Sequence, residues 1–96
     1  MAVAVVNEIP QGNQSFYDEV NPRVMPDGRL PEGCQVHIAG PSGGGWRVIT
    51  VWDSEERFQQ FRSEKLIPAM KEVGGDDFIA PSVEPDPVHK LVVFSA

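Results

Sequence analysis

Residues 46–61 decide the fold, and they read WRVITVWDSEERFQQF. Every position from 46 to 52 except Arg47 is β-branched or aromatic, which predicts a strand. Asp53 or Ser54 then caps a helix, because either side chain can accept a hydrogen bond from the first helical turn. Two glutamates follow at the positive end of that helix, where negative charge is favourable. We therefore expect a strand that runs directly into a helix.

A second strand and helix are predicted near the N-terminus. Residues 2–7 are short and mostly apolar, and a proline and a glycine follow them, which indicates a strand. Asn13 or Ser15 caps the next helix. Pro22 has no N–H and disfavours helical backbone in the residue before it. We expect this helix to kink or stop at Asn21.

The remaining segments complete the order strand, helix, strand, strand, helix, strand. Residues 34–40 alternate in polarity, and a glycine-rich link joins them to the strand at 46–52, which predicts a hairpin. The second helix is interrupted at Pro68, which suits the first turn of a new helical segment. Residues 76–87 contain three prolines and are predicted to form an extended loop. The apolar residues 88–94 are predicted to form the fourth strand.

This order predicts an α+β fold of the ferredoxin-like type in one domain, residues 1–96. The four-stranded sheet is antiparallel, with strand order 4-1-3-2, and both helices cover one face. The strands, however, are apolar on both faces; in the third strand, Val48 and Ile49 point to opposite sides. Two helices can cover only one face. We therefore expect a second copy of the chain to cover the other, as a two-fold homodimer.

Composition narrows the classes of function. Fourteen acidic and eight basic residues give a net charge of −6, which disfavours nucleic acid as a partner. No apolar run approaches the ~18 residues of a membrane span, and the N-terminus lacks the positive region of a secretion signal. Cys34 is the single cysteine, so neither a disulfide nor a zinc framework is expected. We expect a cytoplasmic protein without metal or cofactor.

The strand and helix of residues 46–61 resemble those of the dimeric α/β-barrel superfamily, and more narrowly its antibiotic-biosynthesis-monooxygenase-like branch. That branch often joins an apolar strand to a Trp-acid-Ser cap and a Phe four residues after the Ser, as in Trp52, Ser54 and Phe58 here. The residues around 33–41 also look like small hypothetical proteins of this superfamily. The resemblance implies a homodimeric α/β barrel with a mainly apolar cavity between sheet and helices. It also implies oxidation of quinol-like or polycyclic aromatic molecules by O₂ without metal or flavin.

A haem-degrading group in the same superfamily carries an Asn on its first strand and a Trp and a His on its second helix. This chain has Asn7 on the first strand, but Phe61 and the pair Met70-Lys71 stand near the helix positions. The resemblance therefore does not supply an axial haem ligand.

The expected strand order brings the end of the first strand beside the starts of the third and fourth, where polar side chains gather. His37 is the candidate catalytic residue, because an imidazole with a pKa near 6.5 suits removal of a phenolic proton. The alternative for His37 is a solvated or hydrogen-bonded residue on an edge strand. The candidate substrate-binding residues are Asn7, Tyr17, Trp46, Arg47, Trp52 and His89. Their alternatives are core packing for Trp52 and Tyr17 and a solvent-facing ion pair for Arg47.

The resemblance, taken with these residues, implies a small protein that binds a flat phenolic or quinol-like metabolite. In a cofactor-independent monooxygenase, His37 would deprotonate the ligand and the resulting carbanion would react with O₂. Two alternatives use the same scaffold. One is a non-catalytic dimer that binds small molecules or is associated with stress, and the other is an isomerase or cyclase that uses the same base without oxygen.

Overall fold

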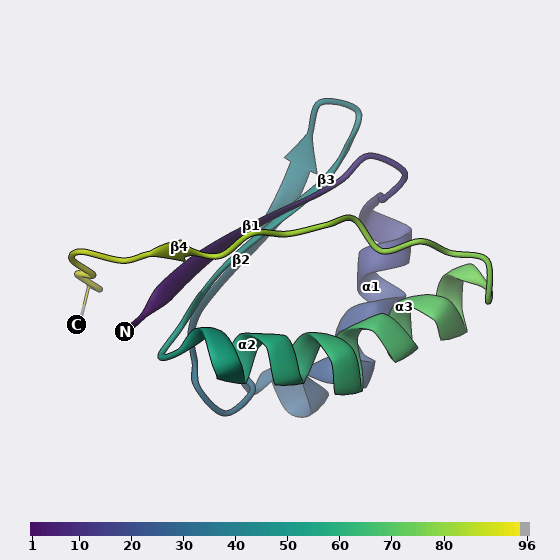
Figure 1. Ribbon diagram of the computed structural model, residues 1–96. Helices are drawn as coiled ribbons and strands as arrows, with labels where there is room; N and C mark the ends of the chain where they lie inside the picture. The colour runs from purple at the N-terminus through teal and green to yellow at the C-terminus, as the bar shows by residue number, and fades with distance from the viewer. Residues whose placement is uncertain (95–96) are drawn as a thin grey trace.

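The computed structural model describes residues 1–94 (Figure 1). Its elements are β1 (Val3–Ile9), α1 (Gln14–Val24), the 3₁₀ turn η1 (Pro26–Gly28), β2 (Cys34–Ser42), β3 (Gly45–Trp52), α2 (Glu55–Phe61), the π-helical turn η2 (Arg62–Leu66), α3 (Ile67–Gly74) and β4 (Asp86–Pro87). The sheet is antiparallel with the order β2-β3-β1-β4. The predicted ferredoxin-like α+β fold is confirmed, and the helices lie on one face of the sheet (Figure 1). None of the helices in residues 1–94 has the length and apolar character to cross a membrane.

The helix-facing side of the sheet carries the core. In β1, Val3, Val5, Asn7 and Ile9 are buried, and they alternate with residues that are more exposed. The register pairs Val5 with Thr50 and Asn7 with Val48, so the even-numbered residues of β3 share this face. Strand periodicity therefore places Trp46 and Trp52 beneath the helices together with Asn7.

Helix α1 continues through Pro22 to Val24, so the expected stop at Asn21 is wrong. Asn13 is the N-cap, and its Oδ1 accepts from the Phe16 N–H at 2.8 Å. Pro22 has no N–H to donate to the Asp18 carbonyl, but it lies two residues before the helix ends at Val24, where few bonds remain to be broken. The Met25 N–H still donates to the Asn21 carbonyl at 2.8 Å. Burial of Val20 and Val24 stabilises this last turn.

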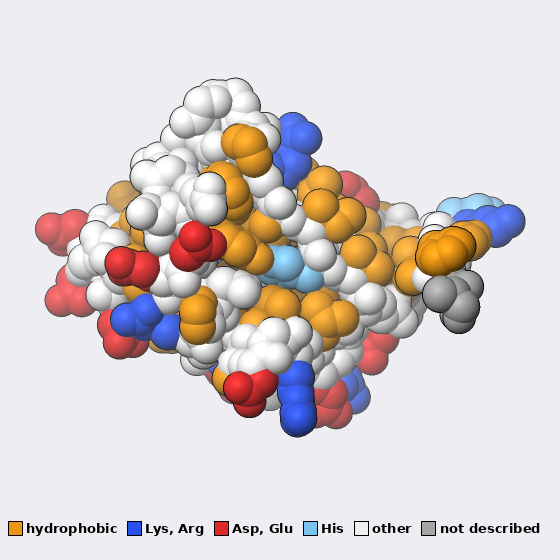
Figure 2. Space-filling view, turned by 180° about the vertical axis from the view of Figure 1, so that it is seen from behind, with side chains coloured by type: hydrophobic (Ala, Val, Ile, Leu, Met, Phe, Trp, Pro, Cys, Tyr) orange, Lys and Arg blue, Asp and Glu red, His pale blue; other side chains and the backbone are white. Residues whose placement is uncertain are grey.

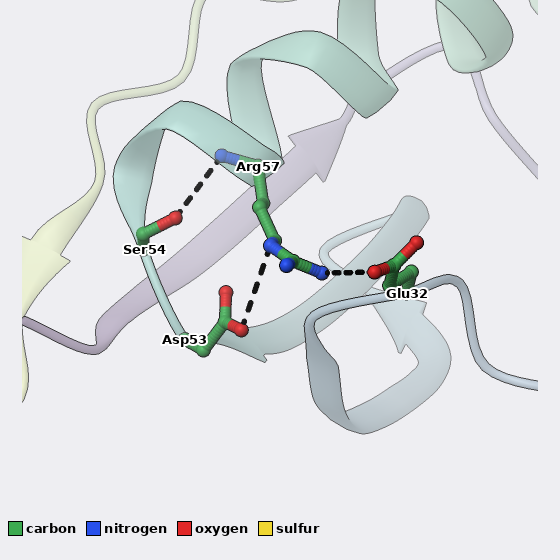
Figure 3. A network of polar contacts seen from close by, with 4 residues as sticks. All are labelled: Glu32, Asp53, Ser54 and Arg57. Atoms are coloured by element: carbon green, nitrogen blue, oxygen red, sulfur yellow. Dashed lines mark hydrogen bonds and ion pairs between the residues drawn. The ribbon is translucent and has the colours of Figure 1, made fainter.

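The start of α2 is fixed by three contacts that Figure 3 shows. Ser54 is the N-cap, and its Oγ accepts from the Arg57 N–H at 3.2 Å. The Arg57 guanidinium lies 2.9 Å from Glu32 and 3.7 Å from Asp53, which ties the loop before β2 to the helix. Gly33 sits under this network with φ of +89°, and a Cβ there would lie 2.5 Å from the Arg57 Cδ. Only glycine fits both the backbone conformation and the space.

The predicted interruption at Pro68 is present as the turn η2. Pro68 lies in the first turn of α3 and has no N–H to donate to the preceding turn. The chain widens by one residue there, and the Ile67 N–H donates to the Arg62 carbonyl five positions back. The widened turn keeps Met70 buried against the sheet, while Phe61 and Leu66 pack partly buried beside it.

The predicted strand at 88–94 is wrong. Pairing with β1 occurs one step earlier, at Asp86 and Pro87, which lie opposite Ala4 and Val3. The Val88 N–H donates to the Ala2 carbonyl at 2.9 Å, and the antiparallel register then passes the beginning of β1. Residues 89–94 form no strand in the described part of the chain. Their end projects from the body of the molecule, with Phe94 90% exposed (Figures 1 and 2).

The sheet face away from the helices is apolar along its middle, as predicted. The register aligns Val6, Ile49 and Ile38 across three strands. Val6 is 49% exposed and Ile38 is 55% exposed. The next row along carries the ion pair of Glu8 with Arg47. The described chain therefore presents to solvent a hydrophobic stripe bounded by one charged pair.

Candidate functional site

A cavity of about 60 Å³ lies between the sheet and the helices. Its floor includes Val5 from β1 and Val48 from β3, and its other walls include Val20 from α1 and Met70 from α3. Most of the lining is hydrophobic, with a few polar side chains among it. Such a space, apolar with a small number of polar groups, is typical of a small-molecule site.

The polar centre of the cavity is a contact between α1 and β2. The Tyr17 hydroxyl lies 2.6 Å from Nε2 of His37. The Tyr17 ring also packs on Trp46, with ring centroids 5.5 Å apart. These three aromatic side chains come from three different elements and line one wall. Figure 2 shows a histidine ring at the surface amid hydrophobic side chains.

Burial shapes the protonation of this pair. Loss of solvent lowers the pKa of His37 below its ordinary value, because the charged imidazolium is poorly solvated there. Burial raises the pKa of Tyr17, and the negative charge of Asp18 raises it further. At neutral pH the imidazole is therefore neutral and the phenol keeps its proton. A neutral imidazole is the form that can accept a proton.

Two buried polar atoms in the lining have no hydrogen-bond partner among residues 1–94: Oδ1 of Asn7 and Nε1 of Trp46. Asn7 is 8% exposed. The indole of Trp52, on the same strand as Trp46, differs because its Nε1 donates to the Thr50 hydroxyl at 2.9 Å. Buried polar groups are nearly always paired in folded proteins, so the two unpaired atoms mark a place where a ligand or water completes the bonding.

Five of the seven sequence-predicted site residues line this cavity: Asn7, Tyr17, His37, Trp46 and Trp52. Trp52 is 1% exposed and packs on Phe58 and Phe61, so packing accounts for much of its surface.

The structure does not bring Arg47 and His89 to the cavity. Adjacent residues on a strand point to opposite faces, so Arg47 lies on the far side from Trp46 and pairs with Glu8. The hydrogen bond from Arg47 lowers the pKa of the Glu8 carboxyl. His89 is exposed and follows the pairing at Val88, beside the beginning of β1 rather than its end.

Cys34 lines the cavity although strict alternation places it opposite His37. A β-bulge between Cys34 and Val36 reverses the parity, and sequence alternation alone does not reveal a bulge. The Cys34 thiol contacts the Val36 carbonyl at 3.4 Å, and burial raises its pKa. The thiol therefore stays protonated and acts as part of the apolar wall.

The cavity is smaller than the ~150 Å³ space that accommodates benzene in an engineered apolar cavity. Ring binding therefore requires the walls to adjust. Met25 and Met70 supply flexible side chains for this. An open cleft of about 630 Å³ adjoins the cavity, and Val24, Pro31 and Phe61 line both spaces. Movement of this shared wall would join them.

Comparisons with known proteins support the fold. No family model matches the sequence, and no curated protein matches it. A candidate antibiotic biosynthesis monooxygenase from Deinococcus radiodurans is similar in structure, with a TM-score of 0.59, 10% identity, and 100% of each chain covered. Another from Chloroflexus aurantiacus has a TM-score of 0.57 and 13% identity, and the match covers 98% of this chain and 100% of that one. This chain therefore shares the ferredoxin-like fold of these two structures.

Proposed function

We propose that this protein binds a flat phenolic metabolite in the cavity and oxidises it with O₂ without a cofactor. The observation that carries the proposal is the 2.6 Å contact of the Tyr17 hydroxyl with His37 Nε2 inside a mainly apolar space. The names of the two similar structures, both candidate monooxygenases, agree with this class of reaction.

The first step is removal of a proton from the ligand. With the imidazole proton on Nδ1, the Nε2 atom of His37 accepts from the Tyr17 hydroxyl. The ligand gives its proton to the Tyr17 oxygen as the Tyr17 proton passes to Nε2. Because burial lowers the pKa of His37, the base is available at neutral pH. His37 thus acts through Tyr17.

The second step uses O₂ as the co-reactant. A ring CH₂ that has lost one proton carries a carbanion delocalised into the ring, and its carbon forms a bond to O₂. The peroxide takes back the proton held by the pair and then loses water. CH₂ becomes C=O, with one oxygen atom in the product and the other in water. The apolar walls orient the ring and exclude solvent.

We also propose that the protein is a homodimer formed through the outer sheet face. The row Val6, Ile49 and Ile38 supports this, because a solvated sheet face ordinarily alternates with polar residues. The exposed Leu91, Val92, Val93 and Phe94 add apolar surface near the same sheet.

Oxygen uptake in the presence of anthrone or the smaller 2-tetralone tests the catalytic proposal. Tyr17→Phe and His37→Gln are each expected to slow turnover by about 10²–10⁴-fold, the usual contribution of a positioned acid or base. Quenching of tryptophan fluorescence reports binding, which both variants should retain. Ser63→Ala, an exposed change outside the cavity, is the control. Equal uptake by all variants would exclude the pair as the base. Binding without uptake in any form would favour the non-catalytic binding protein.

A further inference from the structure

We infer that the ligand carries both a hydrogen-bond donor and a separate acceptor on one flat ring, and that Asn7 and Trp46 recognise them. The inference rests on the proposed binding function of the cavity, and it adds the ligand class. Its basis is the pair of unpaired buried atoms in the lining, one an acceptor and one a donor.

The two atoms differ in kind, which sets what the ligand must offer. Oδ1 of Asn7 can only accept, and Nε1 of Trp46 can only donate. A hydroxyl on the ligand satisfies the first, and a carbonyl oxygen satisfies the second. A purely hydrocarbon ring would leave both atoms buried and unpaired, so the site discriminates against it.

The two residues lie close enough to be reached from one ring. In the register of β1 and β3, Asn7 pairs with Val48 and Ile9 pairs with Trp46. Asn7 and Trp46 are therefore diagonal neighbours on the helix-facing side, at a typical separation of about 7–8 Å. Substituents on separated positions of one ring span a comparable distance. A hydroxyl and a carbonyl on adjacent positions would bond to each other instead.

The other tryptophan provides the contrast that identifies Trp46 as the recognising residue. Trp52 is on the same strand and lines the same cavity, but its Nε1 is already bonded to Thr50. The N–H of Trp52 is thus used by the fold, whereas that of Trp46 remains available. The Tyr17 ring, 5.5 Å from Trp46 by ring centroids, supplies a flat surface beside it.

Titration calorimetry with matched single-ring probes tests the inference. The probes are 3- and 4-hydroxyacetophenone, with acetophenone lacking the donor and 3- and 4-ethylphenol lacking the carbonyl. The better hydroxyacetophenone isomer should bind about tenfold more tightly than either kind of partial probe, the value of one buried hydrogen bond. Trp46→Phe should remove the preference for the carbonyl, and Asn7→Leu the preference for the hydroxyl. Trp52→Phe should keep both preferences.

The outcomes separate this inference from the function on which it rests. If all the probes bind equally well to the native chain, the two atoms are satisfied by water and the inference fails, while ring binding stands. If the preferences persist in Trp46→Phe and Asn7→Leu, other residues read the ligand and the inference also fails. If none of the probes binds, the proposed function fails as well.

Discussion

The two tryptophans of β3 allow one matched comparison of stability. Trp46→Phe and Trp52→Phe make the same chemical change on the same strand, and only Trp52 has its indole N–H bonded. Trp52 is 1% exposed, so the lost volume leaves a cavity, and Thr50, 8% exposed, loses its partner. Together these cost about 2–4 kcal/mol. Trp46 is half-buried and loses no hydrogen bond, so its change should cost about 0–1 kcal/mol.

The assay is urea unfolding at pH 7 followed by circular dichroism, at one fixed protein concentration because a dimer would link stability to concentration. The expected difference of about 1–4 kcal/mol corresponds to roughly 4–32 °C in Tm for a domain of this size. Equal losses in the two variants would show that the Trp46 N–H is bonded in solution. That result would refute the conclusion that the Trp46 N–H is unpaired until a ligand binds.

Three further predictions concern other parts of the molecule. Ile38→Glu on the outer sheet face should convert a dimer to a folded monomer in sedimentation velocity, and Gln35→Glu, also exposed on β2, should not; a native monomer at micromolar concentration would contradict the dimer. Ser54→Ala should cost about 1 kcal/mol by loss of the α2 cap, against less than about 0.5 kcal/mol for Ser63→Ala, both by urea unfolding. Burial lowers the pKa of His37 in the folded protein, so as the pH falls His37 takes up a proton in the unfolded chain at a higher pH than in the folded one. Native stability should therefore fall relative to His37→Gln as pH drops through 6.5, and parallel curves would oppose this.

The fold was predictable where local patterns and sheet parity suffice. The strand and capped helix at 46–61 follow from their own residues, and Ser54 caps α2 as expected. The prediction of a strand at 88–94 failed because strand pairing depends on where β4 meets β1. The apolar character of a short segment does not fix that register. The predicted stop at Asn21 failed because Pro22 lies close to the helix end. Burial of the last turn there outweighs the loss of a single hydrogen bond.

Strand parity also predicts part of the candidate site. Parity along β1, β2 and β3 gathers Asn7, His37 and Trp46 on the helix-facing side. Arg47 was grouped with them by position along the chain, although neighbouring residues on a strand face opposite ways. The contact of Tyr17 with His37 depends on how α1 packs over β2, which no single segment encodes. The unpaired states of Asn7 and Trp46 are likewise properties of the packed cavity alone.

The most direct test of the site is the pair of indole N–H resonances in the ¹H–¹⁵N spectrum during titration with the tighter-binding hydroxyacetophenone isomer. The chain has two tryptophans, so the two signals can be assigned with Trp46→Phe and Trp52→Phe. We predict that the Trp46 signal moves downfield to saturation as its N–H gains an acceptor, and that the Trp52 signal, already bonded to Thr50, moves much less. A saturating titration in which Trp46 stays in place would contradict the account.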